Sequence, residues 1–430
     1  MRISPMICSI AKYTIGKLMA VCCVDNQRAL SIITVLLATA SMSINAAECH
    51  ENEMGSINCG SAYSAVVDSS GTLWISYVQD QHVFVSRSQD RGKSFLDPVK
   101  VNELAESIEH NGENRPKIIV TPTQEVLVSW TLKTSNRYTG EIRFSRSADG
   151  GKNFSVPRTI NDDGLKVGHR FESMFLTESG HLYLAWIDKR ELHASIQAGE
   201  EYAGAAIYYA VSDDLGKSFS PNFPVSSNSC ECCRIAIAPR GQDKIAILWR
   251  QIYGEQIRDH AFAVLSPHGV VSQLARASVD DWYINACPHH GPAMVEANTD
   301  NEFHIAWFSN GDIHQGIHYA RYAADTAITS NIYPVDKTPG AGHPSVAVFE
   351  DRVYLVWKGF DGRATQLNMI VSEDGGANWS QPETLYSTAL ASDYPFLVQD
   401  ENGLYLSWHS EEYGYLLSGL KGKGAVNENI

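Results

Sequence analysis

Residues 147–154 read SADGGKNF, and their pattern, Ser-x-Asp-x-Gly-x-x-aromatic, occurs four times along the chain. The other copies are SQDRGKSF (88–95), SDDLGKSF (212–219) and SEDGGANW (372–379). In such a segment the Asp carboxylate can accept hydrogen bonds from nearby backbone N–H groups, and Gly permits a positive φ. The pattern therefore predicts a tight turn between two strands, after which the aromatic residue folds back into the sheet.

A short strand that ends in an aromatic residue recurs in step with these turns. Large apolar residues alternate along each copy, as they do in a half-buried strand, and a second apolar stretch and a turn precede each one. Successive copies are 50 to 63 residues apart, a period that suits a four-stranded propeller blade. The copies are GTLWISY to Tyr77, EVLVSW to Trp130, HLYLAW to Trp186, KIAILW to Trp249, EFHIAW to Trp307, RVYLVW to Trp357 and GLYLSW to Trp408.

The turns and the strand repeat together resemble the Asp boxes, or BNR repeats, of sialidases and related β-propellers. The resemblance implies an all-β propeller of four-stranded blades. Seven strand pairs favour seven blades, with YGYLLSGL as the third strand of the last blade and residues 48–58 as its fourth; six blades are the alternative. Asp boxes of this family lie on the outer rim, which implies that the four box carboxylates are structural: Asp90, Asp149, Asp214 and Asp374.

The first part of the chain has the pattern of an export signal. Residues 29–41 read ALSIITVLLATAS, basic residues precede this apolar run, and Ala46 and Ala47 close it. The run is shorter than the roughly 20 residues that span a membrane, so cleavage near Ala47 is favoured over anchoring. We therefore expect a signal peptide at 1–47, a single propeller domain at 48–430, and a periplasmic or secreted protein with no membrane attachment after cleavage.

Composition narrows the classes of partner. The 430 residues are 44% hydrophobic and 19% charged, which allows a large core. Their net charge is −15, and no run of basic residues is present, so the chain is a poor candidate for binding nucleic acid or an anionic membrane. A small molecule or a glycan, bound where the inner strands of several blades converge, is the expected partner.

Polar residues gather before the marker strands, at positions that would line one mouth of a propeller channel. The family resemblance implies three arginines that grip a substrate carboxylate, a Tyr–Glu nucleophile pair and an Asp as acid or base. The candidates here are Arg115, Arg170, Arg234, Glu172, Tyr394 and Asp188. Guanidinium groups match carboxylates in a bidentate way, but the same arginines could instead form structural ion pairs with neighbouring carboxylates. This interpretation predicts an exo-glycosidase or glycan binder for an anionic sugar, with no cofactor.

Cysteine and histidine residues at the same end predict a second chemistry. Three of the nine cysteines lie in the leader, and Cys49 and Cys59 are expected to form a disulfide. The motifs CECC (230–233) and CPHH (287–290) fall on adjacent repeats, and thiolates with imidazoles are good ligands for copper or zinc. The alternative function is a metal-binding propeller that uses Cys232, Cys233, Cys287, His289, His290 and His343. Three other interpretations remain open. The cysteines could form structural disulfides, for example between one cysteine of CECC and Cys287; one of them could be a reactive thiol; or the protein could be a scaffold held together by disulfides.

Overall fold

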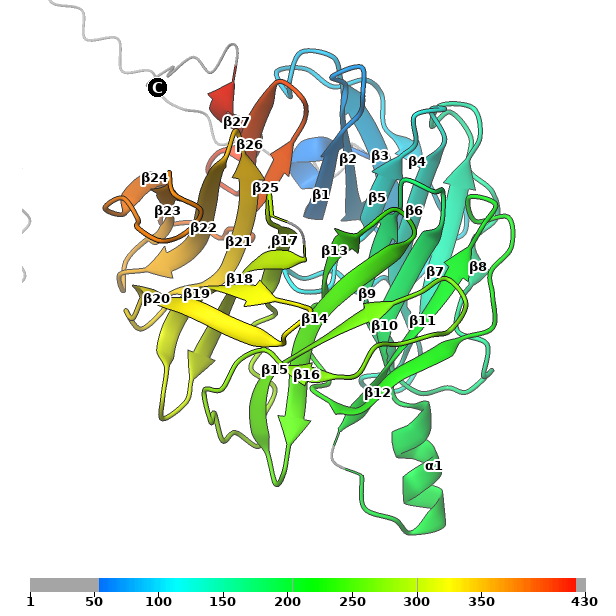
Figure 1. Ribbon diagram of the computed structural model, residues 1–430. Helices are drawn as coiled ribbons and strands as arrows, with labels where there is room; N and C mark the ends of the chain where they lie inside the picture. Colours follow the sequence, from blue (N-terminus) through cyan, green and yellow to red (C-terminus); the bar gives the residue numbers. More distant parts are fainter. Residues whose placement is uncertain (1–53, 203, 300, 423–430) are drawn as a thin grey trace, which may run out of the picture. The chain divides into compact units, whose positions relative to one another are not determined.

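The strands follow one another as antiparallel meanders, seen in the computed structural model of the chain (Figure 1), which describes residues 54–202, 204–299 and 301–422. The first three groups are β1 (Ser61–Val67), β2 (Leu73–Gln79), β3 (His82–Ser88) and β4 (Val99–Lys100); β5 (Lys117–Val120), β6 (Val126–Lys133), β7 (Gly140–Ser147) and β8 (Arg158–Thr159); β9 (His169–Leu176), β10 (Leu182–Asp188), β11 (Ala205–Ser212) and β12 (Phe223–Ser229).

Four further groups complete the described chain. They are β13 (Ala236–Arg240), β14 (Lys244–Tyr253), β15 (Ile257–Leu265) and β16 (Ala275–Arg276); β17 (Ala293–Glu296), β18 (Glu302–Asn310), β19 (Gln315–Ala323) and β20 (Ile328–Asp336); β21 (Gly342–Phe349), β22 (Arg352–Phe360), β23 (Thr365–Ser372) and β24 (Glu383–Thr388); β25 (Phe396–Gln399), β26 (Gly403–Ser410) and β27 (Gly414–Gly422). The prediction of an all-β chain built from four-stranded sheets is confirmed.

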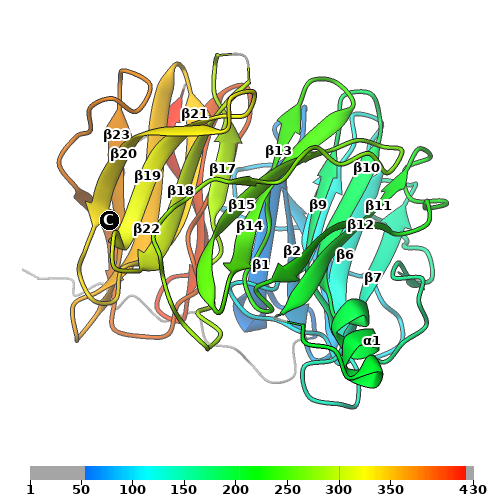
Figure 2. The ribbon, with the colours of Figure 1, turned by 60° about the horizontal axis from the view of Figure 1, so that its bottom comes forward.

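Neighbouring groups meet along their first strands. A single residue pair, Ser229 with Gln251, joins β12 to β14 and merges the third and fourth groups into one eight-stranded sheet. Contacts run from β1 to β5, β5 to β9, β9 to β13, β13 to β17, β17 to β21, β21 to β25, and from β25 back to β1. Figure 2 shows β17, β18 and β19 side by side in one such group. The starts of the seven first strands are thereby brought toward one another.

The last group has three strands in the described chain. The third, β27, is the predicted strand YGYLLSGL. The predicted fourth strand spans residues 48–58, of which the structure describes 54–58. No strand is found there; Ile57–Cys59 form a short 3₁₀ helix, η1, which contacts β27. Cys59 is disulfide-bonded, and its expected partner Cys49 lies outside the described residues, as does the predicted signal peptide at 1–47.

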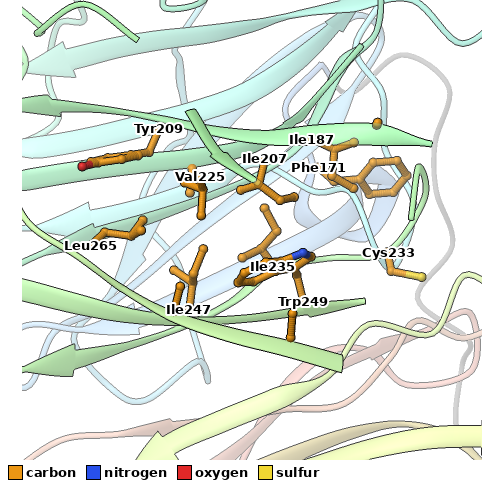
Figure 3. Packing of buried hydrophobic residues seen from close by; sticks show 14 of the residues in the cluster. Phe171, Ile187, Ile207, Tyr209, Val225, Cys233, Ile235, Ile247, Trp249 and Leu265 are labelled. Carbon is orange, nitrogen blue, oxygen red and sulfur yellow. The ribbon is translucent and has the colours of Figure 1, made fainter. Parts of the chain in front are cut away.

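The marker aromatics form the core between the sheets, as predicted. Trp130, Trp186 and Trp249 are fully buried, and so are their equivalents in later groups. Figure 3 shows Trp249 packed among Ile235, Ile247 and Cys233. Each buried indole N–H still needs an acceptor, and each finds one near its strand end; Trp186 donates to Asp188 and Trp249 to Gln251, both at 2.8 Å.

The four Asp-containing segments form the same turn. In the third copy Ser212 Oγ donates to Asp214 at 2.8 Å and accepts from the Gly216 N–H at 2.8 Å. Asp214 also accepts from the backbone N–H of Ser218 at 2.8 Å and from its hydroxyl at 2.6 Å. Gly216 has a φ of +83°, which a side chain would strain. These bonds satisfy the turn within itself, so the carboxylate needs no ligand to be stable.

Replacing Asp214 with Ala is expected to lower the free energy of unfolding by about 1–2 kcal/mol, because three donors lose their charged acceptor. The adjacent Asp213 is a matched control: it is largely exposed and pairs with His181 at the surface. Asp213→Ala should change stability by less than about 0.5 kcal/mol. Urea unfolding of both variants checks this; equal losses would contradict a turn-specific role.

One helix interrupts the repeat. α1 (Arg190–Ala198) follows β10 and ends at Gly199, whose φ of +72° provides a left-handed cap. Sequence reasoning did not predict this insertion; it contacts β11 and hangs at the lower right of Figure 1, below β12. Within residues 54–422, apart from the gaps given above, no helix has the length and apolarity needed to cross a membrane.

Candidate functional site

Seven side chains at or just before the starts of the inner strands form one continuous polar network, here called the mouth. They come from the segment before β5, from β5 and β9, and from the segments that open β13, β21 and β25. They are Glu113, Arg115, Lys117, Glu172, Arg234, His343 and Tyr394. Antiparallel meanders place all these starts at the same end of the molecule, so residues far apart in sequence become neighbours.

Arg115 ties the second group to the last. Its guanidinium donates to Asp393 at 2.8 Å, to the Tyr63 carbonyl at 2.6 Å and to the Gly112 carbonyl. The group is almost fully buried, and it lies 4.1 Å above the Phe396 ring. All three guanidinium nitrogens are therefore occupied by protein partners.

Glu113 is the most enclosed carboxylate of the mouth. It accepts a hydrogen bond from Arg234 Nη1 at 2.5 Å, from the backbone N–H groups of Arg234 and Gly291 at 3.0 and 2.8 Å, and contacts His343 Nδ1 at 3.0 Å. Burial raises the pKa of Glu113, but Arg234 and His343 more than offset this effect and hold the pKa well below its usual value. Glu113 is thus an ionised carboxylate at neutral pH.

Three rings stack beside this carboxylate. Tyr394 lies flat on His343, with 3.4 Å between ring centroids, and His343 stacks in turn on His290 at 4.5 Å. A Cβ on Gly112 would approach the Tyr394 ring to 2.0 Å, so only Gly leaves room for the stack. Burial, followed by the charges of Glu113 and Asp393, raises the pKa of Tyr394 to about 12. Burial and His343 lower the pKa of His290 to about 3.

Glu172 and Lys117 form a second centre on β9 and β5. Glu172 Oε2 accepts from the Thr131 hydroxyl at 2.7 Å, whereas its Oε1 is buried without a hydrogen-bond partner. Burial raises the pKa of Glu172, and Lys117 only partly offsets the rise. Burial, reinforced by Arg115 and Arg234 and opposed by Glu172, lowers the pKa of Lys117 to about 8. Lys117 Nζ donates once, to the Arg115 carbonyl at 2.6 Å.

The predicted clamp of three arginines is arranged as ion pairs within the protein. Arg115 holds Asp393, Arg234 holds Glu113, and Arg170 binds Glu109, with 2.6 Å between Arg170 Nε and Glu109 Oε2. Arg115 and Arg234 both lie over Phe396, whereas Arg170 lies over Phe171. The interpretation of these arginines as structural ion pairs, left open by the sequence, matches this geometry more closely than a ready carboxylate clamp.

The structure places the remaining predicted residues with separate partners. Tyr394 neighbours Glu113, through their shared contact with His343, while Glu172 has Thr131 and Lys117 as its neighbours. Asp188 is fully buried one strand outward, where Trp186 Nε1, the Arg190 backbone N–H and the Arg190 side chain all donate to it. Asp188 therefore serves as an acceptor for the Trp186 indole and for Arg190, the first residue of α1.

The cysteines of the CECC motif converge. The sulfurs of Cys230, Cys232 and Cys233 lie 3.7 to 4.0 Å from one another, and all three residues are buried. Cys287 is exposed, and its thiol interacts with that of Cys232. His290 and His343 belong to the ring stack of the mouth, and His289 lies 6.5 Å from the Phe171 ring. The predicted metal set is thus divided between a sulfur cluster and the mouth.

Several residues of the site escaped sequence reasoning. Glu113 sits two positions before Arg115 in a segment with no strand pattern, and Lys117 opens β5 two positions after it. Extending the alternation of β5 back by two residues, through Pro116, would have placed Arg115 and Lys117 on the same face. Glu113 offered no such signal, because the segment that carries it is irregular.

A large hollow lies away from the mouth. It has a volume of about 870 Å³ and is lined by the β13–β14 turn, β15, β16 and the end of β19, including Arg240, Phe262 and Tyr322. The mouth side chains are not among its lining residues. This hollow is a competing place for a ligand.

No protein-family model matches this chain, and no curated protein matches it. Among solved structures the chain is similar to an ulvan lyase of polysaccharide lyase family PL25 bound to -[GlcA(1-4)Rha3S]-, with a TM-score of 0.53 and 10% identity over 83% of this chain and 90% of that chain.

Two further similar structures are a sialidase and an arabinanase. The NanB sialidase of Streptococcus pneumoniae has a TM-score of 0.47 and 9% identity over 73% of this chain and 67% of that chain. The α-L-arabinanase of Penicillium chrysogenum has a TM-score of 0.47 and 12% identity over 71% of this chain and 90% of that chain. The similarity to the lyase spans most of both chains and, at this identity, shows a shared fold. The predicted resemblance to the sialidase-like fold is confirmed at the level of the fold.

Proposed function

We propose that this protein is a glycan-processing enzyme for an anionic sugar, with the mouth as its active site and Glu172 as its acid or base. The architecture that supports this site is a closed propeller of seven blades. The cyclic chain of contacts between first strands, ending with β25 against β1, supports the closure. The ulvan lyase of shared fold is bound to a uronate-containing saccharide, which is the class of ligand proposed here.

The proposed function rests mainly on Glu172. A carboxyl group buried in a low-dielectric site stays protonated to higher pH, and this is how enzymes keep a general acid available near neutrality. Glu172 has a raised pKa, while Glu113 in the same mouth has a lowered one. Two carboxyl groups whose pKa values are driven apart can serve as acid and as ionised partner. Oε1 of Glu172 is buried without a hydrogen-bond partner, and a substrate hydroxyl or glycosidic oxygen that reached it would supply the missing partner.

The charge of the mouth supports an anionic ligand. Two lysines and three arginines lie in the mouth or beside it, against four carboxyl groups, one of which is Glu172 with its raised pKa. They are Arg115, Lys117 and Arg234 of the mouth with Arg170 and Lys358 beside it, against Glu113 and Glu172 of the mouth with Glu109 and Asp393 beside it. The chain as a whole has a net charge of −15, so this excess is local. Because the arginines are occupied by protein carboxylates, Lys117 and Lys358, which each make one hydrogen bond, are the cations with donors left for a ligand.

Sugar release from matched substrates tests this function. Fluorogenic sialosides, glucuronides and galacturonides are offered beside the neutral glucoside and galactoside, and at least one acidic substrate is expected to be cleaved in preference to its neutral analogue. Glu172→Gln should lower kcat by about 10²–10⁴-fold, the usual contribution of a positioned acid or base. Lys117→Met should raise KM by about tenfold or more, because a charge-assisted hydrogen bond to the substrate is lost.

The control is Glu373→Gln, which removes an exposed carboxylate that pairs with Arg352 at the surface. This variant should keep the wild-type rate. Absence of cleavage and of binding across the panel would overturn the proposed function. A Glu172→Gln variant with a rate within threefold of wild type would overturn the role of Glu172.

A further inference from the structure

We propose that Cys230, Cys232 and Cys233 form a three-thiolate site for Cu(I), next to the mouth but separate from it, with Cys287 as the thiol through which the metal enters. The site includes Cys230 of the CECC motif, which the predicted metal set left out, and it uses none of the histidines of that set. It is independent of the glycan chemistry proposed for the mouth.

The spacing of the sulfurs is that of thiolates sharing one ion. A metal–sulfur bond of about 2.3 Å places sulfurs about 3.8 Å apart at tetrahedral angles and about 4.0 Å apart in a trigonal plane. The three observed separations are 3.7, 3.8 and 4.0 Å. A disulfide would instead need about 2.05 Å between two of them. A disulfide within the trio would also use only two of the three cysteines and leave the third unpaired.

The chain holds this trio in place from both sides. Cys230 follows β12, and its backbone N–H donates to the Arg250 carbonyl on β14 at 2.9 Å. Cys233 packs in the apolar cluster with Phe171, Ile235 and Trp249 (Figure 3). The turn between β12 and β13 is therefore fixed by backbone bonding and by core packing, and its sulfurs face one another inside the fold.

A buried cation contacts the site: Arg258 Nη1 donates to Cys230 Sγ at 3.1 Å. Soft thiolate ligands favour Cu(I), and three ligands leave Zn²⁺ short of its usual four.

Cys287 is exposed, whereas the three cysteines of the trio are buried. A thiol in this position can receive a soft ion and pass it inward by ligand exchange. On the same turn, Glu231 forms an ion pair with Lys189.

Cu(I) titration of the untagged full-length chain tests this site. The protein is purified without oxygen or chelator and is titrated with Cu(I) in competition with bicinchoninate. One Cu(I) per chain is expected, with a sulfur-only first shell by X-ray absorption. Cys230→Ser and Cys233→Ser should each weaken binding by about 100-fold or more, and Arg258→Met by about 10-fold. Cys287→Ser should slow the rate at which the chain takes up Cu(I) more than it changes the affinity for Cu(I).

His290→Ala is the matched control, because His290 belongs to the set predicted from the sequence and lies in the mouth. Its Cu(I) affinity should stay within threefold of wild type; a larger loss would overturn the thiolate-only assignment. Alkylation of the wild-type chain gives a second readout that needs no variant to fold. When the chain is unfolded, bound Cu(I) should protect the three buried thiols from alkylation. A disulfide within the trio would overturn the proposal, and so would a chain that binds no Cu(I).

Discussion

Arg234→Met is expected to lower the free energy of unfolding by about 3–5 kcal/mol. The reason is the carboxylate left behind: Glu113 is almost fully buried, and Arg234 supplies both its nearest charged donor and its main neutralising charge. Without that charge, Glu113 must remain ionised in a low-dielectric site or take up a proton. Either outcome costs more than the loss of an exposed ion pair.

Arg240→Met provides the comparison, since Arg240 pairs with Asp325, which is 61% exposed. This change should cost less than about 1 kcal/mol. Adding Glu113→Gln to Arg234→Met should restore part of the lost stability, because a neutral amide needs no counter-charge. Urea unfolding of the three variants measures these differences. An Arg234→Met variant no less stable than Arg240→Met would show that the Glu113 site is solvated.

Acidification from pH 6.5 to pH 4 is expected to remove about 3 kcal/mol of stability through His304 alone. His304 on β18 is 3% exposed, and burial, with the nearby charge of Arg321 adding and Glu302 opposing, lowers its pKa to about 4. Above pH 6.5 the folded and unfolded chains both hold a neutral ring, so stability is complete there. Below it the unfolded chain binds a proton that the folded chain does not bind until about pH 4.

His304→Gln isolates this contribution. The amide can still hydrogen-bond the Tyr319 hydroxyl, which lies 2.6 Å from His304 Nδ1, but it does not titrate. Between pH 6.5 and pH 5 the variant should lose about 2 kcal/mol less than wild type. Urea unfolding at both pH values gives the two differences. Identical pH dependence in the two proteins would mean that the folded His304 is protonated as readily as the unfolded one.

Features of the fold that repeat along the chain could be predicted from sequence. The marker strands ending at Trp130, Trp186 and Trp249 and the Ser-x-Asp turns rest on local alternation and local hydrogen bonding, so each copy carries its own signal. Features that occur once could not be predicted. The helix α1 is a single insertion after Asp188, and η1 stands where a strand was expected.

The sequence predicted the end of the strands at which the site residues gather, but not which residues pair with each other. Register placed Arg115, Arg234, His343 and Tyr394 at one end of the inner strands, where they do form one network. Which carboxylate each arginine would bind depends on contacts such as Arg115 with Asp393, 278 positions apart, and no local pattern encodes such a pair. For the same reason the sequence grouped the cysteines with the histidines, whereas packing separates them.

The most direct test of the mouth as a glycan site is a crystal structure of the Glu172→Gln variant with an anionic oligosaccharide that the wild-type protein cleaves. The variant should trap the sugar, with the sugar carboxylate within hydrogen-bonding distance of Lys117 Nζ and a sugar oxygen at the amide that replaces the Glu172 carboxyl group. A saccharide bound instead in the hollow lined by Arg240, Phe262 and Tyr322, with the mouth empty, would contradict the account.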